Sequence, residues 1–118
     1  MLEKLKQLGF NTEEAMQYCA NQTSIYREVL KTAHTEGMQK IPLLQECVQN
    51  KDFKRYAIEV HAVKSTAKTI GAVALYEVAE RLNQHAKAGE EEMAYRGNDN
   101  LVEQYKKTLQ EIAAAIIE

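Results

Sequence analysis

The sequence has few of the residues that break or cross-link a chain. Its 118 residues include one proline, five glycines and two cysteines, and 45% are hydrophobic. This composition argues against collagen-like and low-complexity chains, and it is enough for a packed core. Cys19 and Cys47 lack CxxC spacing, which fits a reducing cytoplasm better than a disulfide scaffold or a zinc site. We therefore expect one cytoplasmic domain that spans residues 1–118.

The sequence also lacks an excess of positive charge and any long apolar run. Fifteen basic and seventeen acidic side chains give a formal net charge of −2, so the basic excess typical of nucleic-acid binding is missing. No apolar run approaches the roughly 20 residues that span a bilayer. Residues 1–9 contain no apolar signal-peptide region. We expect neither nucleic acid nor membrane as a partner.

Every periodic segment has the period of an α-helix. Apolar residues in 53–70 follow alternating spacings of three and four, and similar stripes lie in 26–48, 75–86 and 101–116. Four helices that are each apolar on one stripe can bury those stripes together only in a bundle. The sequence therefore predicts an all-α fold, an antiparallel four-helix bundle with a short N-terminal covering helix.

Capping and helix-breaking residues place the ends of these helices. Asn11, followed three residues later by glutamate, predicts the start of the short first helix. Gly71 ends or interrupts the stripe of 53–70, and Gly37 and Pro42 predict a kink or a split in the stripe of 26–48. The polar segment 89–100 is typical of a loop between the last two helices.

The segment from His61 to Gly71, HAVKSTAKTIG, has the composition of a reactive site. His61 lies away from the apolar stripe, so its imidazole is expected in solvent. A lysine-lined imidazole suits a phosphoryl carrier, because ammonium groups offset the added charge and donate hydrogen bonds to its oxygens. Small residues leave room for another protein. The neighbours on this helix face, which include three lysines and no carboxylate, are Lys54, Ala57, Ile58, Lys64, Ser65 and Lys68.

The pattern from His61 to Asn83 resembles that of histidine-containing phosphotransfer (HPt) domains, which are four-helix bundles that relay phosphoryl groups between receiver-domain aspartates. The resemblance implies that His61 accepts the phosphoryl group on Nε2 and that Lys64 contacts it. It also implies that Gly71 keeps the start of the neighbouring helix close. Ser65 stands where the family most often has glycine, and Asn83 where glutamine or glutamate usually supports the imidazole.

The expected chemistry requires no cofactor in this chain. A solvated histidine is mostly neutral at pH 7, which leaves one ring nitrogen free to attack phosphorus. The His61 face has no carboxylate cluster, so we expect Mg²⁺ in the receiver partner. A glycine-rich phosphate loop is absent, which argues against autokinase activity. Expected partners are response-regulator receiver domains, with a hybrid sensor histidine kinase as a further candidate.

Two other functions fit a helical bundle. A di-iron enzyme needs Glu-x-x-His pairs, and none of the three histidines has a glutamate three residues before it. The open alternative is a non-catalytic docking or dimerisation module, in which the face with Lys54, Ile58 and Lys64 binds a partner without covalent chemistry. In either case we expect the docking surface at Ile58 and Ala57, ringed by lysines, with its other half on the preceding helix.

Overall fold

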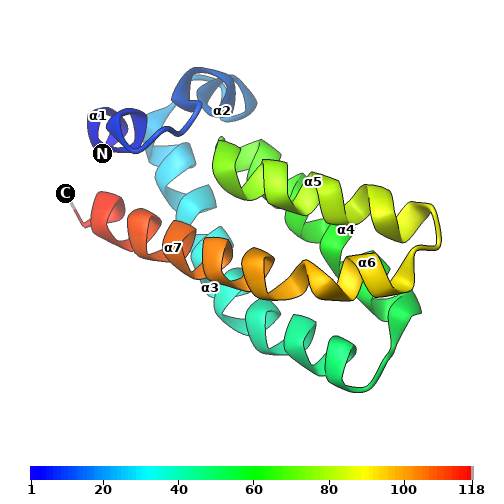
Figure 1. The fold of residues 1–118 in the computed structure, drawn as a ribbon. Helices are drawn as coiled ribbons and strands as arrows, with labels where there is room; N and C mark the ends of the chain where they lie inside the picture. The colour runs from blue at the N-terminus through cyan, green and yellow to red at the C-terminus, as the bar shows by residue number, and fades with distance from the viewer. Residues whose placement is uncertain (118) are drawn as a thin grey trace.

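The computed structural model describes residues 1–117, which form seven helices and no strand (Figure 1). The all-α prediction is confirmed. No helix within these residues is long and apolar enough to span a membrane. The helices are α1 (Leu2–Gln7), α2 (Thr12–Tyr18), α3 (Thr23–Gln49), α4 (Phe53–Ile70), α5 (Val73–Lys87), α6 (Glu91–Arg96) and α7 (Asn98–Ile116).

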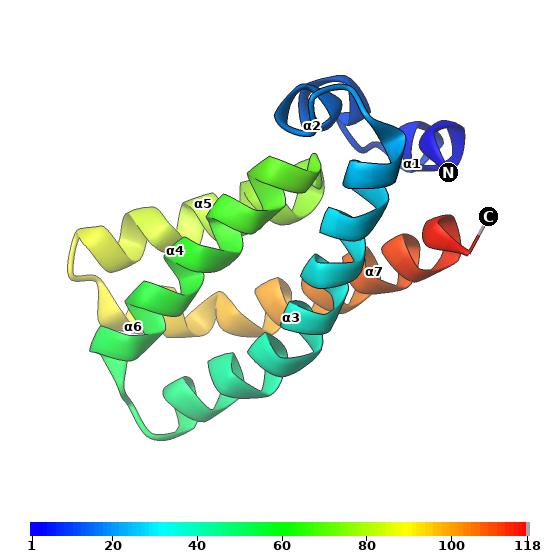
Figure 2. The same ribbon diagram turned by 180° about the vertical axis from the view of Figure 1, so that it is seen from behind.

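The four long helices α3, α4, α5 and α7 form a closed ring of contacts (Figures 1 and 2). Near the start of α3, the Tyr26 hydroxyl donates a hydrogen bond of 2.7 Å to the carbonyl of Ile70 at the end of α4. Further along α3, Lys40 Nζ lies 2.5 Å from Glu59 Oε1 in the first half of α4. These pairs show that α3 and α4 are antiparallel.

Helix α4 has the boundaries that its sequence predicts. The Asp52 side chain accepts a hydrogen bond from the backbone NH of Arg55 at 3.3 Å, which caps the first turn. Gly71 ends the helix in the left-handed conformation, with φ of +77°. The residues of the apolar stripe that are buried in the bundle are Tyr56, Val60, Val63, Ala67 and Ile70.

The N-terminal cover consists of two short helices instead of the single one expected. Asn11 caps α2, because its Oδ1 accepts a hydrogen bond from the backbone NH of Glu14 at 3.1 Å. The backbone NH of Asn11 also donates to the carbonyl of Gly71 at 2.8 Å. A Cβ at residue 71 would lie 2.5 Å from the Asn11 carbonyl oxygen. Gly71 therefore allows the N-terminal segment to pack directly on the end of α4.

Helix α3 is continuous across Gly37 and Pro42, so the predicted split does not occur. Its axis turns part-way along, which Figure 2 shows. Gly37 is buried against α7, and a Cβ at that position would lie 2.7 Å from Leu109 Cδ2. The glycine thus permits a close approach of α3 and α7.

The prediction of a loop over residues 89–100 is wrong, because this segment contains α6 and the start of α7. The ring of Tyr95 packs edge-on against Phe53 and Tyr56, with centroid distances of 5.9 and 5.5 Å. Asn98 is buried and accepts a hydrogen bond of 2.9 Å from the Tyr56 hydroxyl. Contacts with α4 stabilise a helix here that the polar composition does not indicate.

Candidate functional site

His61 lies on the outward face of α4, on the side opposite the buried stripe. Its side chain is exposed, as the helical spacing predicts. On the same face Ser65 is exposed one turn further along. Ile58, one turn before His61, is 61% exposed although it is a large apolar residue. The imidazole is therefore accessible to a partner protein and stands beside an apolar side chain.

The seam between α4 and α5 fixes what lies next to His61. Lys64 Nζ of α4 is 3.3 Å from Glu80 Oε2 of α5. One turn further, Lys68 Nζ lies 5.6 Å from the centre of the Tyr76 ring. Residue numbers rise along α4 as they fall along α5, so the two helices are antiparallel. By the same register, His61 lies level with Asn83.

The His61 face of α4 itself has no carboxylate, but two other helices bring one to each of two of its lysines. Lys64 forms an ion pair with Glu80, and Lys68 Nζ forms a hydrogen bond of 2.9 Å with Glu14 Oε1. Both carboxylates come from other helices, α5 and α2, so the spacing along α4 gives no sign of them. Lys54 is exposed. The lysines near His61 thus differ in how closely they are paired with carboxylates.

Hydrogen bonds and nearby lysines keep both carboxylates ionised. The hydrogen bond from Gln84 Nε2 to Glu80 Oε1, at 2.5 Å, is the largest cause that lowers the pKa of Glu80, and Lys64 and Lys87 lower it further. The hydrogen bond from Lys68 lowers the pKa of Glu14 and raises that of the lysine. The sequence interpretation missed Glu80, Gln84 and Lys87, which the period of α5 places on one face.

Asn83 and Gly71 are buried, unlike the other predicted site residues. Asn83 is 2% exposed, and its Nδ2 donates no hydrogen bond within residues 1–117. It therefore gives the imidazole of His61 no hydrogen bond from that amide nitrogen. Gly71 contacts Asn11 rather than the exposed face. Gly71 therefore joins the end of α4 to the N-terminal segment.

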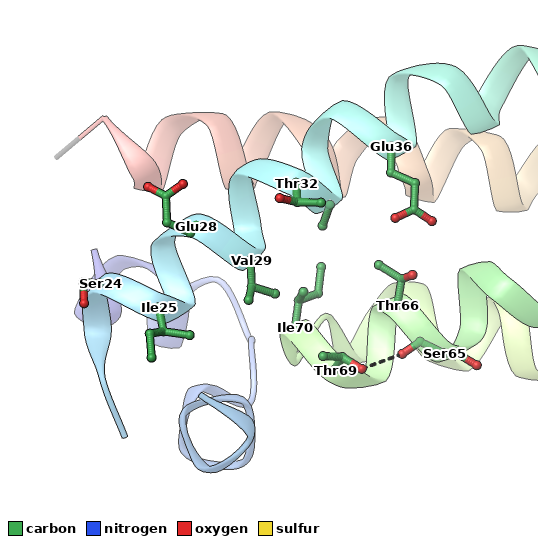
Figure 3. Close-up of a pocket in the computed structure, with 11 residues that line it drawn as sticks. Ser24, Ile25, Glu28, Val29, Thr32, Glu36, Ser65, Thr66, Thr69 and Ile70 are labelled. Carbon is green, nitrogen blue, oxygen red and sulfur yellow. Dashed lines mark hydrogen bonds between the residues drawn. The ribbon is translucent and has the colours of Figure 1, made fainter. Parts of the chain in front are cut away.

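A groove of about 630 Å³ between α3 and α4 begins one turn from His61, at Ser65 (Figure 3). The preceding helix, α3, lines one side of this groove, and its expected part in a docking surface stays a prediction. Glu28 and Glu36 of α3 add negative charge to its lining, whereas the lysines expected around the docking surface lie on α4. The lining residues are Ser24, Ile25, Glu28, Val29, Thr32, Ala33, Glu36, Ser65, Thr66, Thr69 and Ile70.

The other two histidines have different surroundings. His85 Nδ1 lies 3.0 Å from Glu90 Oε1, at the end of α5. His34 is partly buried and lines a separate groove between α3 and α7, beside Met38 and Lys106. Neither combines the exposure of His61 with a neighbouring lysine of α4.

The sequence model of the Hpt domain matches residues 13–115, from the first turn of α2 to near the end of α7. The chain belongs to the Hpt domain family. Hpt domains generally transfer phosphoryl groups in two-component phosphorelays and interact with response-regulator receiver domains. No curated protein matches this Hpt domain in sequence. The family match confirms the resemblance found in the motif, and it covers α3, α4, α5 and nearly all of α7.

Proposed function

We propose that this Hpt domain accepts a phosphoryl group on His61 from the aspartate of one receiver domain and transfers it to another. The observation that best supports this is the exposure of His61 on α4 in a chain of this family. Free thiols at Cys19 and Cys47, both buried, fit a relay in the reducing cytoplasm.

The proposed transfer requires a nucleophile and positioning, and no cofactor of this chain. A neutral imidazole with its proton on Nδ1 has a lone pair on Nε2. When Nε2 attacks, a nitrogen–phosphorus bond forms, the bond between phosphorus and the aspartate oxygen breaks, and the receiver's carboxylate leaves. The reverse steps deliver the group to a second receiver. The receiver supplies Mg²⁺, while this chain orients the imidazole and offsets charge.

Lys64 is the residue best placed to offset that charge. It stands three residues after His61, so the two side chains share one face of α4. Its side chain is 20% exposed and contacts α5 through the ion pair with Glu80. An ammonium group has three donors, and a single carboxylate contact leaves others for phosphoryl oxygens. We assign Lys64 the phosphoryl contact.

We place the receiver's docking surface at Ile58 and the groove between α3 and α4. Ile58 and Ser65 are seven residues apart and therefore lie on the same face of α4. A receiver centred on His61 would cover the apolar side chain of Ile58 and insert into the groove. The mixed charge around it, with lysines on α4 and carboxylates on α3, favours a receiver surface of mixed charge.

The test is incubation of the protein with a phosphorylated receiver domain. We expect acid-labile, base-stable phosphate on the wild type and none on His61→Gln, with unchanged helix content by circular dichroism. Labelling of His61→Gln, or a receiver that binds the wild type without transferring phosphate, would contradict the proposal. The second result would favour the non-catalytic docking module.

A further inference from the structure

We propose that Glu80 tunes His61 as a phosphoryl carrier by competing with the phosphoryl group for Lys64. This inference rests on the function proposed above and adds a positioning residue to it. Its effect is to keep phosphorylated His61 from being so well stabilised that the group is not passed on.

The geometry gives Lys64 an anionic partner before any phosphoryl group arrives. Its Nζ lies 3.3 Å from Glu80 Oε2, with both side chains largely covered, at 20% and 27% exposure. Glu80 Oε2 is a buried atom that accepts no hydrogen bond within the described part of the chain. The contact is thus an ion pair across the seam between α4 and α5. Lys64 is therefore the counter-ion of this oxygen.

Gln84 holds the carboxylate of Glu80 in place. Its Nε2 donates a hydrogen bond of 2.5 Å to Glu80 Oε1, one helical turn along α5. With one oxygen fixed by Gln84, the other is directed toward Lys64 across the seam. The lowered pKa of Glu80 is consistent with a carboxylate that stays charged near neutral pH. Glu80 is therefore a permanent competitor for the lysine.

A charge count shows why the competition matters. Lys64 and Lys87 act on Glu80 from α4 and α5, so these three groups together carry a net charge of about +1. A phosphoryl group adds about −1.5 to −2 at pH 7. The phosphorylated site is then short of positive charge, whereas without the carboxylate of Glu80 the charges would nearly balance. A carrier that must pass on its phosphoryl group benefits from the shortage of positive charge that Glu80 causes.

The test measures how a phosphoryl group distributes at equilibrium between one receiver domain and this protein. The variant Glu80→Gln removes the charge and keeps the shape. We expect the ratio of phosphorylated His61 to phosphorylated receiver to rise about three- to fivefold. The matched control is Glu77→Gln, which removes an exposed carboxylate from the same helix and should leave the ratio unchanged.

The same measurement in a Lys64→Ala background separates competition from direct repulsion. Competition for the lysine predicts that Glu80→Gln has almost no effect once Lys64 is absent. An equal rise in both backgrounds would overturn the inference, because the carboxylate would then act on the phosphoryl group directly. An unchanged ratio in Glu80→Gln, with the wild type labelled normally, would overturn it and leave the proposed function standing. No labelling of the wild type would overturn both.

Discussion

At the scale of the residue, the environment of His61 depends on side chains from helices other than its own. The exposure of His61 follows from its place on the helical wheel of α4, which the sequence is sufficient to predict. The charge around it does not follow, because Glu80 reaches Lys64 from α5 and Glu14 reaches Lys68 from α2. Spacing within one helix predicts neighbours on that helix, and partners across a seam require the register between helices.

Lys64→Ala tests whether the lysine contacts the phosphoryl group. A charge-assisted hydrogen bond of about 1.5 to 3 kcal/mol would be lost, which corresponds to transfer slower by roughly ten- to hundredfold. Stability should change little, because partly exposed ion pairs contribute little to it. Single-turnover transfer from a phosphorylated receiver measures the rate. The control Lys68→Ala should have a smaller effect, since Lys68 stands seven residues from His61 and forms a hydrogen bond with Glu14. Equal rates in wild type and Lys64→Ala would contradict the assignment.

The pair of Glu14 and Lys68 makes a contribution to stability that depends on pH. The pKa of Glu14 is lowered by the hydrogen bond from Lys68, and that of Lys68 is raised. The carboxylate therefore stabilises the fold above the ordinary carboxyl pKa and ceases to do so as pH falls through its lowered value. The lysine's share is lost only when pH rises through its raised pKa, in the alkaline range.

We accordingly expect Glu14→Gln to destabilise the protein at about pH 7 and much less at about pH 3. Urea unfolding of wild type and variant at both values measures the difference. Glu13→Gln, which removes an exposed neighbouring carboxylate of α2, is the control and should show little change. The same loss of stability at both pH values would show that the ion pair is not its cause.

At the scale of the element, the sequence predicts those helices that have a clear apolar stripe, capping residue or terminating glycine. The stripe of 53–70, the cap at Asn11 and the stop at Gly71 are all found where the sequence places them. The helix α6 was not predicted, because it has only six residues and a polar, glutamate-rich sequence. Packing of Tyr95 on Phe53 and Tyr56 stabilises it, and such contacts between distant segments leave no periodic pattern.

Gly71→Ala tests how α4 is joined to the N-terminal segment. A Cβ there would meet the Asn11 carbonyl oxygen at 2.5 Å in a backbone with positive φ. Gly89→Ala is the matched control, since Gly89 has φ of +72° and a Cβ added there would have no neighbouring atom within 4 Å. We expect the control to lose about 1 kcal/mol and Gly71→Ala to lose at least about 1 kcal/mol more, in urea unfolding. Equal losses would contradict the close packing.

At the scale of the whole molecule, the ring of four helices presents His61, Ile58 and the groove between α3 and α4 on one side. The sequence predicted the bundle because four apolar stripes have few other ways to be buried. It could not predict the groove, which depends on how closely α3 and α4 approach.

Ile58→Glu tests the docking surface. A buried carboxylate at the centre of the interface should weaken receiver binding and transfer by about tenfold, without unfolding the bundle. Met38→Glu is the matched control, because Met38 is 60% exposed, like Ile58 at 61%, but lies beside the groove between α3 and α7. Binding measured by NMR titration should be unchanged in this control. Shifts confined to residues 89–100 on titration would place the docking surface elsewhere.

The central claim is that His61 Nε2 carries the phosphoryl group, and mapping that group in the intact protein tests it most directly. Phosphorus-31 and nitrogen-15 NMR of the wild type, labelled from a phosphorylated receiver domain, identifies the modified atom. The account predicts one phosphohistidine signal, on His61 Nε2, that disappears in His61→Gln. A phosphoryl group on His34, on His85 or on a carboxylate would contradict it.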